Sequence, residues 1–265
     1  MRERLAAAGR QRRAMLLIAL AMVLAASGVD AQSLLPPLVT CALTTYDAEA
    51  KGVISYDRHL HFVQRIPTMN QDYRFDSRRL RIDHALVAVK LYRKFDGKQV
   101  SSADALKSAQ AELDSAPLQD ELAKFPFNAS AAADYAYTPV AAPSRASSTG
   151  TQFHVATRVR DELHGDGDIW IDAGSCHFER VVIAPSRYSQ VLDPYHVTGQ
   201  IVVRFAAVAN GLNDVRDVKA HFVGHSGFVV GTIDYDEVYD AYTHYATREQ
   251  GMQALSQAIP TGGSK

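Results

Sequence analysis

Alternation of apolar and polar residues is clearest in the second half of the chain. It predicts six short strands, over residues 153–160, 169–173, 176–183, 197–205, 218–224 and 228–233. Turn-forming sequences separate several of them, namely Gly165-Asp166-Gly167, Asn210-Gly211 and Ser226-Gly227. Short strands at this spacing are typical of an antiparallel sheet or a β-sandwich.

Helical spacing of apolar residues predicts two helices. One covers residues 101–125 and is interrupted by Pro117. The other is a C-terminal helix that begins at Asp234, has Glu237 at the capping-box position, and packs on the sheet. Residues 58–66 and 80–95 are further predicted strands, and two prolines make residues 33–38 an extended tether. Together these elements predict an α+β fold.

Composition and pattern divide the chain into four parts. Residues 1–31 form a leader, and residues 32–125 form a smaller N-terminal β/α region. Residues 126–150 are rich in Ala, Ser, Pro and Thr, which predicts a linker or long loop. Residues 151–265 form a C-terminal antiparallel β domain with the terminal helix packed on it.

The leader combines five arginines with an apolar run from Ala14 to Ala26. This order is typical of a secretory signal peptide, and small residues favour cleavage after Ala31. A retained anchor is the alternative, although a membrane span needs about 20 apolar residues. The pair Arg12-Arg13 also fits a twin-arginine signal, so two export routes stay open. We expect a soluble periplasmic or secreted protein that meets a membrane only during export.

Charge and cysteine content narrow the classes of partner and compartment. The formal net charge is −1, and cleavage of the arginine-rich leader leaves a mildly acidic protein. Nucleic-acid binding normally needs a basic patch, so we expect no nucleic-acid partner. Cys41 and Cys176 in an exported chain predict a disulfide bond, with two separate buried thiols as the alternative. The chain has no glycine-rich phosphate loop, and we expect no cofactor.

Histidine spacing provides one candidate metal site. His59 and His61 share one face of a predicted strand about 6–7 Å apart, and a distant third ligand would complete a site. His221 and His225 have the spacing of a helical metal clamp. On a strand, however, they lie about 13 Å apart, which is too far for one zinc ion. Only His59 and His61 are therefore metal candidates.

Two further motifs lack essential parts. Gly224 lies two residues before Ser226 as in a nucleophile elbow, but Phe228 stands where the motif needs its second glycine. The helix that should follow is also missing, so a hairpin turn explains the residues. Asp166, Asp168 and Asp172 suggest a calcium loop, yet the remaining ligands of an EF-hand are absent from the sequence. Neither motif supports a catalytic or calcium-binding assignment.

Four tyrosines are the candidate ligand- or partner-binding residues. They follow one another at intervals of three and four residues along the predicted terminal helix: Tyr235, Tyr239, Tyr242 and Tyr245. Packing of this helix on the sheet explains the pattern most simply. The alternative is an exposed strip that contacts a partner or an apolar ligand, because tyrosine is enriched at interfaces.

No catalytic constellation emerges from these motifs, and a fold alone does not define a function. The leading hypothesis is an exported binding protein, either an envelope accessory factor or a carrier that holds an apolar ligand between sheet and helix. An exported hydrolase with a His-centred metal or acid–base site is one alternative. The other is a structural subunit of an envelope assembly, which presents a sheet edge to a second protein. The expected partner is thus a small apolar ligand or another envelope protein.

Overall fold

A computed structural model describes residues 35–66, 69–96, 99–115, 118, 120, 122–141, 150–161, 163–186, 196–208, 211–226 and 229–257. The predicted leader, residues 1–31, lies outside the described residues. In chain order the elements are α2 (Pro37–Glu49), β1 (Val53–Ile66), β2 (Met69–Ile82), β3 (Ala85–Asp96), β4 (Gln99–Val100), α3 (Ala103–Ser115), the 3₁₀ helix η1 (Ala129–Asp134), β5 (Tyr135–Pro139), β6 (Thr151–Thr157), β7 (Gly165–Ile171), β8 (Phe178–Pro185), β9 (His196–Ala207), β10 (Asn213–Ser226), β11 (Val229–Tyr245) and α4 (Arg248–Ser256).

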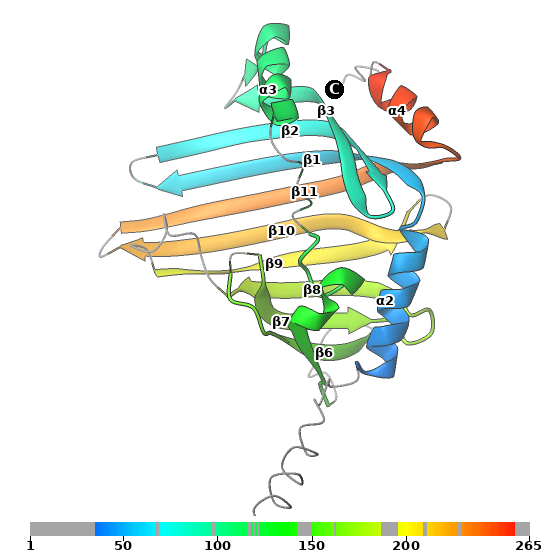
Figure 1. The fold of residues 1–265 in the computed structure, drawn as a ribbon. Coiled ribbons are helices and arrows are strands. Elements are labelled where there is room, and N and C mark those ends of the chain that lie inside the picture. Colours follow the sequence, from blue (N-terminus) through cyan, green and yellow to red (C-terminus); the bar gives the residue numbers. More distant parts are fainter. Residues whose placement is uncertain are drawn as a thin grey trace, which may run out of the picture. The chain divides into compact units, whose positions relative to one another are not determined.

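The strands of the described residues form one eleven-stranded sheet in the order β4-β3-β2-β1-β11-β10-β9-β8-β7-β6-β5. Every neighbouring pair is antiparallel, which confirms the antiparallel sheet predicted from the second half of the chain. β11 pairs with β1, so strands from before residue 125 and strands from after residue 150 share this sheet (Figure 1).

The inner face of the sheet is the face that carries most of the core. Val155, Val181 and Val203 of β6, β8 and β9 are fully buried on it. Helix α2 lies in front of this face in Figure 1 and buries Leu43 and Tyr46 in the same hydrophobic cluster. The Tyr46 ring contacts three phenylalanine rings edge-on, at centroid distances of 5.5, 6.2 and 5.9 Å from Phe127, Phe178 and Phe205. Aromatic contacts of this kind fasten α2 to the sheet.

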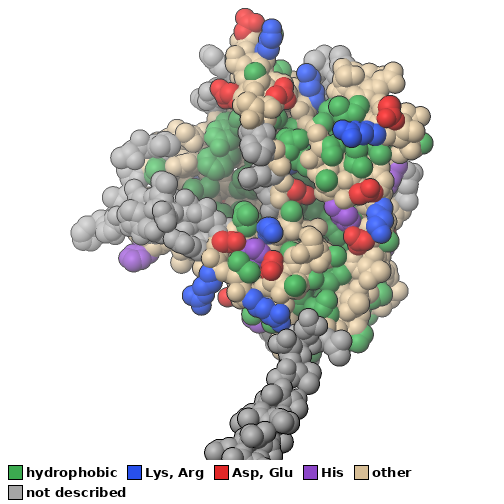
Figure 2. All heavy atoms as spheres, viewed as in Figure 1, with side chains coloured by type: hydrophobic (Ala, Val, Ile, Leu, Met, Phe, Trp, Pro, Cys, Tyr) green, Lys and Arg blue, Asp and Glu red, His purple; other side chains and the backbone are tan. Residues whose placement is uncertain are grey.

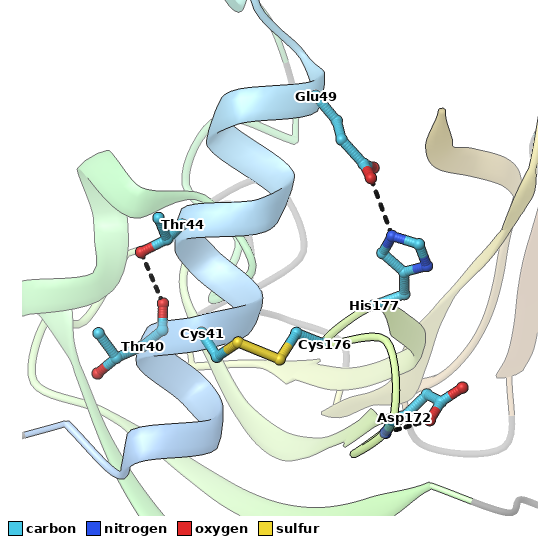
Figure 3. Close-up of a disulfide and its surroundings, with 8 residues drawn as sticks. Thr40, Cys41, Thr44, Glu49, Asp172, Cys176 and His177 are labelled. Atoms are coloured by element: carbon cyan, nitrogen blue, oxygen red, sulfur yellow. Dashed lines mark hydrogen bonds and ion pairs between the residues drawn. A yellow bond between two sulfur atoms is a disulfide. The ribbon is translucent and has the colours of Figure 1, made fainter. Parts of the chain in front are cut away.

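The disulfide bond between Cys41 and Cys176 is confirmed, with the two Cα atoms 5.7 Å apart. It joins α2 to the loop between β7 and β8 (Figure 3). The next residue of that loop, His177, contacts Glu49 at the end of α2 through a 2.9 Å Nε2–Oε1 interaction. The second Glu49 oxygen accepts a 3.0 Å hydrogen bond from the backbone N–H of Asn213. Both ends of α2 are therefore tied to the sheet.

The predicted helix over residues 234–255 is wrong for most of its length. Residues up to Tyr245 belong to β11, and only Arg248–Ser256 are helical, with Thr247 as the N-cap. Tyrosines four residues apart lie on one face of a strand as well as of a helix, so their spacing alone did not distinguish the two. Tyrosine also favours strands, and Glu237 lies on the same face of β11 as Tyr235 and Tyr239.

Further expectations differ from the structure. The predicted strand over residues 80–95 is divided by a turn at Asp83-His84, so its first residues belong to β2 and the others to β3. The expected tether at residues 33–38 ends in helix α2, because a proline is favourable in the first turn of a helix. Residues 129–139, expected in a linker or loop, form η1 and β5. The predicted helix 101–125 is confirmed only as α3, which ends two residues before Pro117. No helix in the described part of the chain is long and apolar enough to cross a membrane.

Candidate functional site

The predicted tyrosine strip lies on β11 rather than on a helix. Tyr239 and Tyr242 are buried, and Tyr235 is half-buried beside an apolar cavity. Their alternation is interrupted at Ala241, whose φ of 51° marks a local irregularity and brings Tyr242 back to the inner side. Tyr245 contacts Ser55 of β1 instead, with a 3.1 Å distance between the two hydroxyl oxygens. The structure thus buries Tyr239 and Tyr242, whereas Tyr235 and Tyr245 are half-buried.

The two candidate metal ligands have separate carboxylate partners. His59 contacts Asp76 at 2.9 Å and Asp240 at 3.3 Å, whereas His61 contacts Asp72 at 3.0 Å. Within the described ranges, no three His, Cys, Asp or Glu side chains form a group that could hold a metal ion. A metal site at His59 and His61 stays a prediction.

Two of the other motifs lie where the sequence placed them, but the predicted turn Gly165-Asp166-Gly167 is wrong, because these residues pair with β8 as the start of strand β7. His221 and His225 belong to strand β10, as expected, and His221 contacts Asp234 of β11 at 2.6 Å. β10 and β11 form a hairpin in which Ser226 pairs with Val229, so no helix follows this serine. The calcium-loop candidates Asp166 and Asp172 instead accept hydrogen bonds from nearby backbone N–H groups.

An apolar cavity of about 370 Å³ lies on the inner face of the sheet. Its walls come from β1, β8, β9, β10 and β11, together with loop residues around 122–125 and 163–164. The apolar side chains that line it are Phe62, Leu122, Phe125, Leu163, Ile183, Pro185, Ile201, Val218, Ala220, Phe222 and Ile233. In Figure 2, viewed as in Figure 1, hydrophobic side chains gather on the face that carries α2. This volume lies within the range of small-molecule sites, about 300–1,000 Å³.

A buried ion pair borders the apolar cavity. Glu237 is 1 % exposed, lines the cavity and forms an ion pair with Arg58, which is 8 % exposed. The hydroxyl groups of Tyr235 and Tyr239 both donate hydrogen bonds to the Glu237 carboxylate. Desolvation by burial raises the pKa of Tyr239 well above its ordinary value, so its hydroxyl stays protonated and acts as a donor. The cavity therefore has a polar wall whose carboxylate is held by two tyrosine hydroxyls and Arg58.

A small polar recess of about 30 Å³ adjoins this wall. Its central ion pair joins Arg81 of β2 to Asp214 of β10, with a 2.5 Å distance between Nη2 and Oδ2. The Tyr46 hydroxyl donates a 3.3 Å hydrogen bond to the same carboxylate. The guanidinium of Arg81 also lies 5.9 Å from the centroid of the Tyr56 ring. Residues from α2, β1, β2 and β10 thus meet in the recess.

Sequence reasoning did not find the charged residues of either site. Arg79 and Arg81 lie on β2, of which the predicted strand 80–95 covers only the last three residues, and Glu237 was interpreted as a helix cap. In the alternating pattern of β1 and β11, Arg58 and Glu237 stand at positions whose side chains point to the inner face. This position was the one available signal. Their pairing across β1 and β11 depends on a contact between residues 179 positions apart, which no local pattern contains.

Comparison with known proteins gives only remote structural similarities. No family model matches the chain, and no curated protein matches it. A LolA superfamily protein from Nitrosomonas europaea is 9% identical with a TM-score of 0.36, over 80% of this chain and 96% of that one. A putative outer membrane lipoprotein-sorting protein domain from Vibrio parahaemolyticus is 9% identical with a TM-score of 0.35, over 82% and 97%. The MucA/MucB complex of Pseudomonas aeruginosa is 9% identical with a TM-score of 0.25, over 80% and 100%. These values establish neither a family nor a function.

Proposed function

We propose that the protein is an exported binding protein that carries an apolar ligand in the cavity on the inner face of its sheet. The observation that carries this proposal is the size and chemistry of the cavity, about 370 Å³ with mostly aliphatic and aromatic walls. Apolar walls release water when a hydrocarbon group enters, which favours binding by roughly 25 cal/mol for each Å² buried.

The predicted leader and the confirmed disulfide support the exported part of the proposal. Disulfides persist in oxidising compartments, such as the periplasm and the extracellular space, and are rare in reducing ones. We therefore place the carrier in the periplasm or outside the cell.

The neutral apolar dye N-phenyl-1-naphthylamine tests the proposal, because its fluorescence rises when it leaves water. We expect the wild-type protein to bind the dye in a saturable way. Ile201 lines the cavity, and replacing it with Trp fills part of the space, so I201W should weaken dye binding at least about tenfold.

Val202 provides the matched control, because successive strand residues point to opposite faces. It lines a hollow on the outer face, together with His221 and Asp234. V202W should bind the dye as the wild type does. Absence of saturable binding to the wild type would refute the proposal, and so would equal binding by I201W and V202W.

A further inference from the structure

Arg79 is a buried cation whose hydrogen-bond donors are available. It lies on β2, pairs in register with Tyr56 of β1, and is 9 % exposed. Its Nε atom is buried without a hydrogen-bond partner. Among the described residues, no side chain forms a hydrogen bond or an ion pair with its guanidinium. A buried cation is normally compensated by an anion, because desolvation strongly penalises an isolated charge.

The neighbouring arginines of the inner face differ from Arg79 in that each of them has a carboxylate partner. Arg58 is paired with Glu237, and Arg81 is paired with Asp214. The same face therefore contains two arginines with buried carboxylate partners and one without.

The polar recess places Arg79 beside another donor. Arg79 and Tyr56 both line the recess, and the Tyr56 hydroxyl donates to no group of the described chain. Burial raises the pKa of Tyr56, although the charges of Arg79 and Arg81 oppose this shift, so the hydroxyl is protonated at neutral pH. Two carboxylates also line the recess: Asp214, held by Arg81, and Asp120, which accepts a 3.0 Å hydrogen bond from the backbone N–H of Leu122.

The recess and the apolar cavity are adjacent. Leu122 lines both of them. Tyr239 lines the recess and donates a hydrogen bond to Glu237, which lines the cavity. A recess of about 30 Å³ has room for about two water-sized groups, which suits the two oxygens of a carboxylate.

We propose that the recess binds the carboxylate of a long-chain fatty acid through the Arg79 guanidinium and the Tyr56 hydroxyl, while the hydrocarbon chain occupies the apolar cavity. This inference rests on the proposed function, because it requires the cavity to hold an apolar chain. An arginine can donate two parallel hydrogen bonds to a carboxylate, and charge-assisted bonds of this kind are strong.

The fluorescent fatty acid cis-parinaric acid and its methyl ester test the proposal, because they share the chain and differ in charge. The wild type should bind the acid about tenfold or more tightly than the ester. R79M should remove this preference and leave binding of N-phenyl-1-naphthylamine unchanged, and R79K should show an intermediate preference. Arg65 lies exposed on β1, so R65M is the matched control and should keep the full preference.

The outcomes separate this inference from the proposed function. The carboxylate site alone would be wrong if the wild type binds the dye but binds the acid and the ester equally. It would also be wrong if R79M keeps the preference for the acid over the ester. A wild type that fails to bind the dye would overturn the proposed function itself. If hexadecyl phosphate displaces the dye at lower concentrations than palmitate does, the head group is a phosphate and the carboxylate assignment is wrong.

Discussion

Removal of the Cys41–Cys176 disulfide should strongly destabilise the protein. The bond closes a loop of 135 residues, and its loss frees the unfolded chain from that constraint. The chain-entropy relation gives a destabilisation of about 5 kcal/mol at 25 °C for a loop of this length. Cys41 is exposed and Cys176 is only partly buried, so little apolar packing is lost with the sulfur atoms. Cys176 has a φ of 58°, but alanine retains the Cβ atom, so the backbone strain stays the same.

Urea unfolding of the C41A/C176A variant measures this effect. With an m-value of about 3 kcal/mol/M, we expect the midpoint to fall by roughly 1.5–2 M relative to the oxidised wild type. Reduced wild-type protein is the control: it should unfold near the midpoint of the variant, and reductant should not change the variant. A midpoint within about 0.3 M of the oxidised wild type would show that the disulfide does not constrain the unfolded chain as argued.

Two further predictions concern buried and surface charges. E237Q keeps the shape of Glu237 but removes the negative charge beside buried Arg58, so the free energy of unfolding should fall by about 3 kcal/mol. Adding R58M to the E237Q chain should restore much of this free energy. Equal urea midpoints for E237Q and the wild type would contradict this prediction. Partial burial lowers the pKa of His59, but hydrogen bonds and charges from Asp76 and Asp240 outweigh it and raise the pKa above its ordinary value. This contribution to stability is fully present below about pH 6.5 and disappears as the pH rises through the folded-state pKa of His59. H59Q should therefore be more destabilising near pH 5.5 than near pH 9. A difference in urea midpoint between H59Q and the wild type that stays constant across that range would exclude His59 as the titrating group.

Strands with one apolar face could be predicted from the sequence because their pattern is local. β6 and β9 alternate with a period of two, and the residues expected to be apolar and inward, such as Phe153 and Val203, are buried in the structure. The strand assignment of His221 and His225 succeeded for the same reason.

Elements that bury charged residues could not be predicted in this way. β2 carries Arg79 and Arg81 on its inner face, so its apolar alternation is lost. The buried position of Arg81 is stabilised by Asp214, which lies 133 positions away in the sequence. β11 was interpreted as a helix because tyrosines at a spacing of four fit both periods, and pairing with β1 and β10 decided between them.

The sequence by itself indicated the antiparallel strands of the second half and a disulfide between its only two cysteines, because local periodicity and residue type favour both, although each had an alternative. The tertiary structure decided that β11 pairs with β1 and that the inner face forms an apolar cavity beside buried ion pairs. It also decided that, of the three described arginines on this face, Arg79 alone has no carboxylate partner. These features depend on contacts between residues more than a hundred positions apart. Their free energy arises from desolvation and charge pairing in the folded interior, which no local pattern of residues encodes.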